Sequence, residues 1–494
     1  MKRVVIIGGG ISGLAAAHRI LERSEASGTQ VHLTLLESSD RLGGIVHTHQ
    51  RDGFLIESGP DSFISEKPAA LDLARRLGLQ SHLIETNERF RRSFVVRAGR
   101  LLPVPPGFQL LAPTELWPFL KSDIFSWRGK ARMALDMALP RGTRNGSFDE
   151  SLASFVRRRL GQEALERMAQ PMIGGIYTAD PEKLSLRATM PPFLEMEREH
   201  RSLIRALRKQ SRSPTVREGS ASGISGARYS LFLSFDRGMQ LLTDRLAERI
   251  SEFRSQTANG ELAKPTIRLA MKVDSLEMER LPSNDGASAA WQIRAAGGET
   301  LTAEAVCVAL PAHASSALFR QVDAQLASYL GEISYASSAT LNLGYRRTDI
   351  PHPLDGFGFV VPFIEGRSMI ACTFSSVKFA GRAPDGLVLL RVFVGGALQP
   401  EMLELSETEL LARVRADLRD LLGVEAAPMF SELRRWERSM PQYHVGHLDL
   451  VERINERASS LRQLVLAGNA YSGPGLPDCI RSGESAADEL LKEF

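Results

Sequence analysis

The chain has 494 residues, of which 43% are hydrophobic and 24% charged, and its formal net charge is +3 at pH 7. At about 100–200 residues per domain, this length predicts two or three domains, and the apolar content argues against an intrinsically disordered chain. The small net charge argues against nucleic-acid binding, which needs a concentrated basic surface. The three cysteines stand far apart without a CxxC pair, as is typical of reduced thiols in a cytosolic protein.

Residues 2–21 predict a strand, a glycine turn and a helix. The run Val4 to Ile7 is apolar on both faces, as expected of a central parallel strand. The spacing GxGxxG follows, in which Gly8 allows a tight turn, Gly10 lets the backbone approach a pyrophosphate and Gly13 lets the helix pack closely. Three consecutive glycines also argue against a secretion signal. The loop residues expected to contact the cofactor are Gly8, Gly9, Gly10, Ile11, Ser12 and Gly13.

A second strand is predicted over residues 31–37, and it ends in Glu37. An acid about 20 residues after such a loop accepts hydrogen bonds from ribose hydroxyls and disfavours a 2′-phosphate. Strand, helix, strand and acid in this order predict a bound dinucleotide.

Two further glycine-rich stretches favour FAD over NAD. After the second strand, Arg41 can pair with a phosphate and Gly43-Gly44 form another close-approach turn, followed by a hairpin at residues 45–57. Near the C-terminus, glycines at 468, 473 and 475 precede a helix whose positive end suits the negative charge of a reduced flavin. We therefore expect one FAD per chain, held without a covalent bond.

Longer motifs give a resemblance to a known family. The segments "GGGISGL", "ESSDRLGG", "ESGPDSF", "PMIGGIYTADPEKLS", "FDRGMQLL", "MPQYHVGH" and "GNAYSGPGLPDCIRSG" together resemble the oxygen-dependent porphyrinogen oxidases of haem synthesis. That family comprises the protoporphyrinogen oxidases and the coproporphyrinogen III oxidases that form coproporphyrin.

The resemblance implies an α/β fold, α+β overall. It comprises a Rossmann-like FAD-binding domain assembled from separated segments, a mixed-sheet substrate domain and a helical insertion. The expected segments are 1–90 (FAD-binding), 91–209 (helical insertion), 210–275 (FAD-binding, with a flexible loop at 211–228), 276–435 (substrate-binding) and 436–494 (FAD-binding). A capping box of Ser406 and Glu409 predicts the start of one helix within the substrate segment, and Gly423 its end.

The resemblance also implies roles for single residues. The backbone carbonyl at Gly174-Gly175 would face the macrocycle, and Gly175 would help to accept a proton. Further cofactor contacts are expected at Ser38, Gly59, Pro60, Asp61, Ser62, Val273, Trp436, Asn469, Pro474, Gly475 and Leu476. Substrate contacts are expected at Phe379, which would stack on a pyrrole ring, and at Leu343 and Val360, which would clamp the ring from the other side.

The position aligned with a propionate-binding arginine of plant and animal members is Ser93, with Arg91 and Arg92 immediately before it. Either arginine could supply the charge. The substrate is therefore left open between protoporphyrinogen IX, with two propionates, and coproporphyrinogen III, with four.

The expected reaction removes six electrons and six protons from the porphyrinogen in three rounds, with molecular oxygen reoxidising the flavin to give hydrogen peroxide. Two alternatives are another flavin oxidase, acting on amines or desaturating carotenoids, and a flavin-bound scaffold without catalysis. The pairs His47/His49 and His444/His447 lack accompanying ligands, so no metal site is expected.

The segment 103–140 mixes Phe, Leu and Trp with Lys and Arg. It could lie on a membrane interface or form an ordinary packed helical subdomain. We expect a cytoplasmic protein, and peripheral association with the inner face of the membrane and a homodimer are further expectations.

Overall fold

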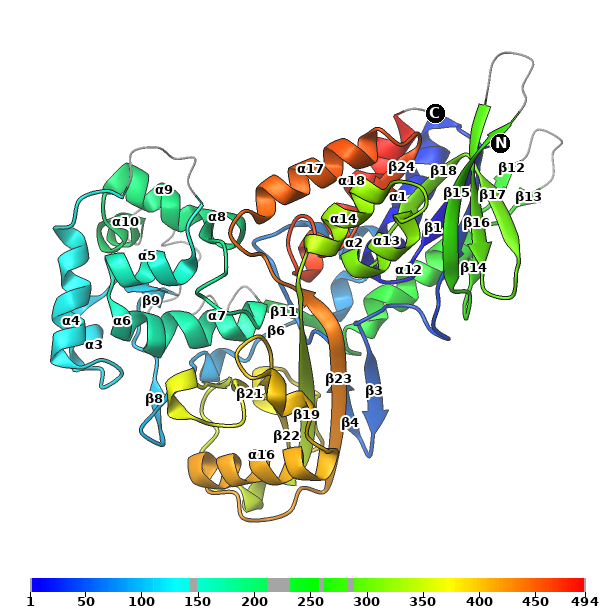
Figure 1. Cartoon of the computed structure of the whole chain (residues 1–494). Helices are drawn as coiled ribbons and strands as arrows, with labels where there is room; N and C mark the ends of the chain where they lie inside the picture. The colour runs from blue at the N-terminus through cyan, green and yellow to red at the C-terminus, as the bar shows by residue number, and fades with distance from the viewer. Residues whose placement is uncertain are drawn as a thin grey trace.

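The computed structural model describes residues 2–109, 111–142, 149–210, 232–256, 262–281 and 288–492. Its central sheet has five parallel strands in the order β14-β2-β1-β18-β24 (Figure 1). The strands are β1 (Lys2–Ile7), β2 (Val31–Leu36), β14 (Thr266–Arg268), β18 (Ala305–Val308) and β24 (Leu464–Leu466). Stretches from both ends of the chain therefore build one sheet, which confirms the predicted assembly from separated segments.

Strand β1 lies in the middle of this sheet because its sequence is apolar on both faces. All four residues from Val4 to Ile7 are buried, and Val4 pairs with Leu33 of β2 and Ala305 of β18. A parallel strand covered on both sides needs such an uninterrupted apolar run. The predicted central strand is confirmed.

Helices cover both faces of the sheet. Val4 and Ile6 share a core with one layer, and Val5 and Ile7 share a core with the other. The first layer is α1 (Ile11–Ser27), α12 (Gln240–Glu252) and α18 (Leu476–Leu491). The second layer is α13 (Ala312–Phe319), α14 (Ala324–Glu332), α17 (His447–Ser459) and the antiparallel sheet β15 (Val273–Leu281), β16 (Ser288–Ala295) and β17 (Thr300–Ala303).

The second large sheet has seven strands in the order β23-β19-β22-β21-β20-β7-β8 (Figure 1). Only the pair β20–β7 is parallel. The strands are β7 (Phe94–Arg97), β8 (Arg100–Pro103), β19 (Tyr335–Arg346), β20 (Gly358–Val360), β21 (Ala371–Phe374), β22 (Leu387–Gly395) and β23 (Phe430–Pro441). Helix α16 (Glu407–Leu422) covers one face, and its predicted capping box of Ser406 and Glu409 and its end at Gly423 are confirmed.

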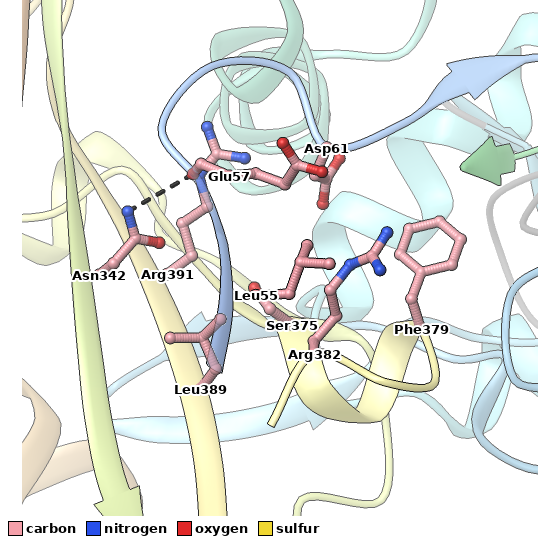
Figure 2. Close-up of a pocket in the computed structure, with 9 residues that line it drawn as sticks. All are labelled: Leu55, Glu57, Asp61, Asn342, Ser375, Phe379, Arg382, Leu389 and Arg391. Atoms are coloured by element: carbon pink, nitrogen blue, oxygen red, sulfur yellow. Dashed lines mark hydrogen bonds between the residues drawn. The ribbon is translucent and has the colours of Figure 1, made fainter. Parts of the chain in front are cut away.

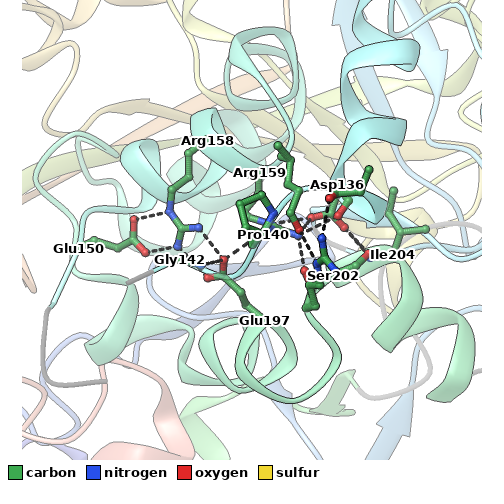
Figure 3. Close-up of polar contacts among 12 residues, drawn as sticks. Asp136, Pro140, Gly142, Glu150, Arg158, Arg159, Glu197, Ser202 and Ile204 are labelled. Carbon is green, nitrogen blue, oxygen red and sulfur yellow. Dashed lines mark hydrogen bonds and ion pairs between the residues drawn. The ribbon is translucent and has the colours of Figure 1, made fainter. Parts of the chain in front are cut away.

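A third part of the chain is mostly helical and has its own core. Its elements are α3 (Leu116–Lys121), α4 (Trp127–Ala134), η3 (Leu135–Met137), α5 (Leu152–Arg159), α6 (Gln162–Ala164), η4 (Leu165–Ala169), α7 (Gln170–Tyr177), α8 (Leu186–Thr189), α9 (Pro191–His200) and α10 (Leu203–Gln210). Figure 3 shows a polar network that joins η3, α5, α9 and the start of α10. Arg159 donates to Asp136 Oδ1 at 2.7 Å, and Arg158 pairs with both Glu150 and Glu197.

Shorter elements connect these parts. They are the hairpin β3 (Thr48–Arg51) and β4 (Phe54–Glu57), the small sheet β5 (Phe63–Ile64), β11 (Phe232–Phe235) and β6 (Leu83–Glu85), helices α2 (Ala69–Arg76) and α15 (Ser375–Lys378), and the pairs β9 (Phe108–Gln109) with β10 (Ala112–Pro113) and β12 (Ser255–Gln256) with β13 (Leu262–Ala263). Short 3-10 turns lie at η1 (Gln80–His82), η2 (Glu88–Phe90), η6 (Arg347–Asp349), η7 (Phe363–Glu365) and η8 (Pro400–Leu403). The predicted hairpin turns at Asp52-Gly53, both of which have positive φ.

Strand pairing departs from the predicted segment boundaries at two places. Residues 276–435 were assigned to the substrate part, but β18 pairs with β1 and β24 in the parallel sheet. Residues 91–209 were assigned to the helical insertion, but β7 and β8 belong to the seven-stranded sheet. Composition shows where strands replace helices but not which sheet a strand joins, because distant contacts decide pairing. The predicted flexible loop 211–228 lies outside the described residues.

In the described ranges, no helix is both long enough and apolar enough to cross a lipid bilayer.

Candidate active site

The turn between β1 and α1 combines tight packing with one open position. Gly8 has a φ of +112°, and a Cβ at Gly13 would lie 1.9 Å from the Gly8 carbonyl oxygen. A Cβ at Gly10, by contrast, would meet nothing within 4 Å. This open space lies at the N-terminus of α1, which begins with the buried residues Ile11 and Ser12 and favours an anion such as pyrophosphate.

The second glycine turn lies directly on the first. The Gly43 amide donates to the Gly9 carbonyl oxygen at 2.9 Å, and a Cβ at Gly44 would come within 3.2 Å of the Gly10 Cα. Next to Gly44, the apolar side chain of Ile45 is 42% exposed. The two turns therefore form one backbone cradle with an apolar edge, which fits a dinucleotide that carries a flat ring.

Arg41 shapes this cradle instead of projecting from it. Its guanidinium donates to the carbonyl oxygens of Leu42 and Val46 at 3.1 and 3.0 Å, and also to that of Gly44. Burial lowers the pKa of Arg41, and the nearby Arg434 adds to this effect. The predicted contact of Arg41 with a phosphate stays a prediction, because in this structure its donors hold the turn.

Glu37 lies at the end of β2, beside the same cradle. Its Oε2 accepts from the Gly9 amide at 2.7 Å, and its Oε1 accepts from the hydroxyl of Ser38 at 3.2 Å and the amide of Ser39 at 2.8 Å. The Glu37 carboxylate is therefore fixed against the loop where a ribose would follow the pyrophosphate. Val273, another predicted cofactor residue, is the first residue of β15 and is 8% exposed.

The turn that follows β4 is held by the seven-stranded sheet. The Ser58 carbonyl oxygen accepts from Trp436 Nε1 and from Thr340 Oγ1, both at 3.1 Å. Arg391 donates to the carbonyl oxygens of Ser58 and Gly59. Three strands, β19, β22 and β23, thus position the predicted cofactor residues Gly59 to Ser62.

Asp61 of this turn forms an ion pair with Lys378, whose Nζ lies 2.9 Å from Asp61 Oδ2. Lys378 also lies 3.1 Å from Ser62 Oγ. Burial raises the pKa of the Asp61 carboxyl, but Lys378 and Arg391 have the larger combined effect and hold the pKa well below its usual range. Pro60, between the Arg391 and Lys378 contacts, is half-buried. This turn is therefore charged, ordered and tied to three strands and a helix.

The C-terminal glycine turn is held by the hydroxyl of Tyr443. This hydroxyl donates to the Asn469 carbonyl oxygen and accepts from the Gly473 amide at 2.8 Å. A Cβ at Gly473 would lie 2.6 Å from Cγ of Asp478, a buried acid paired with Lys67. Pro474 follows, Gly475 is the N-cap of α18 and Leu476 its first residue. The N-terminus of α18 thus lies at this turn, as predicted.

The predicted substrate side is formed by α7 and β20. Gly174 is buried, whereas Gly175 is exposed, and the neighbouring Ile176 is 49% exposed although it is apolar. Val360 is half-buried and packs against the core of the helical part, which includes Ile173 of α7. The substrate contacts predicted for Gly175 and Val360 stay predictions.

Leu343 does not reach this side. It is fully buried in the core beneath α16, on the face of β19 opposite Thr340 and Asn342, which contact the turn after β4. Successive residues of a strand point to opposite faces, so a shift of one residue in alignment moves a side chain to the wrong face. The predicted clamping role of Leu343 is inconsistent with this placement.

Phe379 is also covered, since it is only 1% exposed. Its ring lines a small cavity with Asp61 and Arg382 (Figure 2). The cation of Lys378 lies 5.1 Å from the ring centroid. In this structure the ring does not lie on an open surface, so its stacking on a pyrrole would need the ring to move.

The two arginines before Ser93 differ in their partners. Arg92 pairs with Asp355 and is 42% exposed. The Arg91 side chain is 8% exposed and pairs with the exposed Glu85 and Glu88 at 3.5 and 3.4 Å. Both arginines are thus already paired with acids, and their predicted contact with a propionate stays a prediction.

Sequence reasoning missed several residues that support this site. Arg391 interrupts the apolar run "LVLLRVFVGG", and a charge in such a strand signals a buried partner. An isolated glycine in a helix, Gly483, signals close packing: a Cβ there would lie 2.1 Å from the Ser12 carbonyl oxygen of α1. No local pattern pointed to Asn342, Lys378 or Tyr443.

Among the residues that the structure describes, no group of three or more His, Cys, Asp or Glu side chains is arranged to hold a metal ion. The polar groups of the site instead fix backbone turns. Two glycine turns, a helix N-terminus and an apolar edge fit a flavin dinucleotide.

Comparisons with known proteins agree with this geometry. The chain is 34% identical over 491 residues to a protein named coproporphyrinogen III oxidase from Bacillus subtilis, covering 99% of this chain and 98% of that protein. It is 30% identical to the chloroplastic protoporphyrinogen oxidase of Nicotiana tabacum, covering 98% of this chain and 85% of that protein. A solved structure from Exiguobacterium sp. 255-15, provisionally named a protoporphyrinogen oxidase, superposes with a TM-score of 0.83 at 30% identity and covers 100% of this chain and 99% of that one. Residues 11–491 match the model for flavin containing amine oxidoreductases, and the chain belongs to that family.

Proposed function

We propose that this chain is an FAD-dependent, oxygen-dependent porphyrinogen oxidase of haem biosynthesis. The observation that carries the proposal is the similarity to a coproporphyrinogen III oxidase, which extends over nearly the whole of both chains. The backbone cradle at Gly10 and Gly44 supports it, because it suits a flavin dinucleotide.

Coproporphyrinogen III is the substrate we propose. Two bacterial coproporphyrinogen III oxidases are 34% identical to this chain and a third is 30% identical, and the alignments cover 90–100% of those proteins, against 85% of the tobacco protoporphyrinogen oxidase at 30% identity. Arg91 and Arg92 are the cations proposed to pair with propionates, in exchange for their present partners Glu85, Glu88 and Asp355.

The proposed cofactor is one FAD per chain, bound without a covalent bond. The first glycine loop and α1 would hold the pyrophosphate, Glu37 the ribose, and the turns at Gly59–Ser62 and Asn469–Leu476 the flavin end. Bound FAD supplies two-electron oxidation, so three rounds convert porphyrinogen and three O₂ into porphyrin and three H₂O₂.

The chain's own residues would orient the substrate and assist its deprotonation. The backbone carbonyl of the exposed Gly175 would accept a hydrogen bond from a pyrrole N–H and so polarise that bond for loss of the proton. Ile176 and Val360 offer apolar surface to the macrocycle, while Arg91 or Arg92 would pair with a propionate.

We also propose peripheral docking of a cytoplasmic protein on the inner face of an anionic membrane. Trp117 of α3, Trp127 of α4 and Leu135 of η3 are 75%, 72% and 52% exposed, and the exposed Lys121 and Arg128 lie beside them in sequence. Exposed aromatic side chains beside cations suit the headgroup region. Vesicles containing phosphatidylglycerol should sediment the protein but not its Trp117→Ser/Trp127→Ser variant. The predicted homodimer stays a prediction, which sedimentation velocity can test.

The decisive assay mixes the purified protein with coproporphyrinogen III and protoporphyrinogen IX separately in air and follows porphyrin fluorescence and peroxide. Faster oxidation of coproporphyrinogen III is expected. Anaerobic flavin bleaching by an amine but by neither porphyrinogen would identify an amine oxidase instead. Bound flavin with no peroxide release from any porphyrinogen would leave only a scaffold role.

A further inference from the structure

A small polar cavity lies behind the turn that follows β4. It has a volume of about 10 Å³ and is lined by Leu55, Glu57, Asp61, Asn342, Ser375, Phe379, Arg382, Leu389 and Arg391 (Figure 2). A cavity of this size has room for about one water molecule. Its walls carry two arginines, two acids and an amide, which is unusual for so small a space in a protein interior.

Two of these residues are direct cross-strand neighbours. Asn342 of β19 pairs with Arg391 of β22 in the antiparallel ladder, and both side chains contact the turn after β4. Asn342 Nδ2 donates to the Glu57 carbonyl oxygen at 3.4 Å, the dashed line in Figure 2. Arg391 donates to the carbonyl oxygens of Ser58 and Gly59.

Each of the two leaves one polar atom without a partner among the described residues. These atoms are Asn342 Oδ1 and Arg391 Nε. Asn342 is 1% exposed and Arg391 is 4% exposed, so bulk water does not reach them. Buried polar groups in folded proteins nearly always have a hydrogen-bond partner, which an internal water often supplies.

The chemistry of the two atoms identifies the ligand class. Arg391 Nε is a donor and needs an acceptor, whereas Asn342 Oδ1 is an acceptor and needs a donor. The amide cannot be turned around without losing the donor that faces the Glu57 carbonyl oxygen. A halide ion cannot donate to Asn342 Oδ1, and a metal cation cannot accept from Arg391 Nε. Only a small neutral molecule that both donates and accepts satisfies the pair.

We propose that this cavity binds one ordered water molecule, which accepts from Arg391 Nε and donates to Asn342 Oδ1. Its second hydrogen can go to the carboxylate of Glu57 or Asp61, both on the cavity wall. The water completes the support of the turn whose next residues, Pro60 to Ser62, are proposed to contact FAD. Asn342 is thereby a positioning residue for the cofactor, and this last step rests on the proposed function.

A crystal structure of the full-length, cofactor-loaded protein at about 1.5 Å or better tests the water directly. We expect one density peak within about 3.2 Å of both Asn342 Oδ1 and Arg391 Nε, and no anomalous peak there after a bromide soak. A map without the peak, or with a bromide signal at the site, overturns the proposal. This result does not depend on which substrate the enzyme oxidises.

Two variants test the positioning role. Asn342→Leu keeps the branched shape of the side chain but removes both the acceptor for the water and the Nδ2 donor to the Glu57 carbonyl oxygen, so the density peak should be lost and the FAD dissociation constant should rise about tenfold. Thr340→Val is the matched control, because it removes a hydrogen bond to Ser58 on the same strand face without touching the cavity. Its water peak should remain. A peak retained in the Asn342→Leu protein, or equal FAD affinity in Asn342→Leu and wild type, contradicts the role assigned to Asn342.

Discussion

Lys378 Nζ lies 2.9 Å from Oδ2 and 3.1 Å from Oδ1 of Asp61, in an ion pair whose two side chains are only 13% and 19% exposed. Lys378 ends helix α15, next to Phe379, and its carbonyl oxygen accepts from the Asn87 amide at 3.0 Å. Lys378 thus joins the turn at Asp61, which is proposed to contact the flavin, to Phe379 and to the segment from Asn87 to Arg92, which are proposed to contact the substrate.

Breaking this pair should destabilise the protein strongly. In Lys378→Met the Asp61 carboxylate loses its ion-pair partner and keeps only Arg391 as a nearby cation, and removing one partner of a buried pair costs about 3–5 kcal/mol. Urea unfolding at pH 7 measures the difference. The matched control is Lys272→Met, since the Lys272 side chain is 72% exposed and should change stability by less than about 0.5 kcal/mol. Equal losses in the two variants would show that the pair contributes nothing.

The effect of Lys378→Met should also depend on pH. The pKa of Asp61 is held below its ordinary value of 3.8 by Lys378 and Arg391, against the effect of burial. A depressed carboxyl pKa stabilises the folded state above the unfolded pKa, and this contribution is lost as pH falls below it. The free-energy difference between wild type and Lys378→Met should therefore be largest at pH 7 and shrink as pH falls, because the buried Asp61 carboxyl of the variant binds a proton at a higher pH than that of the wild type. A difference that grows in acid would contradict this assignment.

His447 provides a second pH-dependent contribution, of a different origin. Its ring stacks on Tyr443 with the centroids 3.9 Å apart, and burial lowers its pKa to about 4. In the unfolded chain the imidazole binds a proton below its ordinary pKa of 6.5, whereas the folded protein does so only near 4. The contribution of His447 to the free energy of unfolding is therefore full above pH 6.5, and it falls by about 3 kcal/mol as pH drops towards 4.

The variant His447→Phe isolates this contribution, because phenylalanine preserves the stacking and does not titrate. Urea unfolding of both proteins at pH 7, 5.5 and 4.5 should show a shallower loss of unfolding free energy in His447→Phe. Other histidines titrate equally in both proteins and cancel in the difference. Parallel profiles would mean that His447 has the same pKa in the folded and unfolded states.

The sequence was informative where a residue's role depends on its immediate neighbours. Val4 to Ile7, the glycine spacing and the Ser406–Glu409 capping box are local patterns, and each has the predicted structure. Leu343 shows the limit, because an alignment of segments does not establish which face of a strand a residue occupies. Lys378 and Tyr443 act on residues far away in the chain, and no spacing rule predicts such contacts before the sheets are assembled.

The buried pair Arg159–Asp136 should hold the helical part together. Arg159 is 1% exposed and Asp136 is fully buried, and Asp136 Oδ2 also accepts from Ser202 Oγ at 2.6 Å (Figure 3). Arg159→Met leaves Asp136 without a cation, so we expect a loss of about 3–5 kcal/mol in thermal or urea unfolding. Arg157→Met is the control, because its pair with Glu182 is exposed and is worth about 0–1 kcal/mol. Similar small losses in both would exclude a structural role for the buried pair.

Substitutions at Gly10 and Gly13 should affect different properties. Gly10→Ala should weaken cofactor binding, and Gly13→Ala should lower the stability of the fold. A Cβ at Gly10 meets no protein atom within 4 Å, so Gly10→Ala should fold with an unfolding free energy within about 1 kcal/mol of wild type. If the pyrophosphate lies against Gly10, the added methyl group displaces it, and the FAD dissociation constant should rise at least about 100-fold, or roughly 3 kcal/mol. Quenching of flavin fluorescence on titration of the cofactor-free protein measures this.

Gly13→Ala should behave in the opposite order, because its Cβ would lie 1.9 Å from the Gly8 carbonyl oxygen and the turn itself must move. The cofactor-free Gly13→Ala protein should already melt several degrees below wild type, before any flavin is added. Wild-type FAD affinity in Gly10→Ala would place the pyrophosphate elsewhere, and the roles proposed for Glu37 and the second glycine turn would then fail with it. Unchanged stability in Gly13→Ala would instead mean that α1 and β1 can separate without cost, contrary to their close packing.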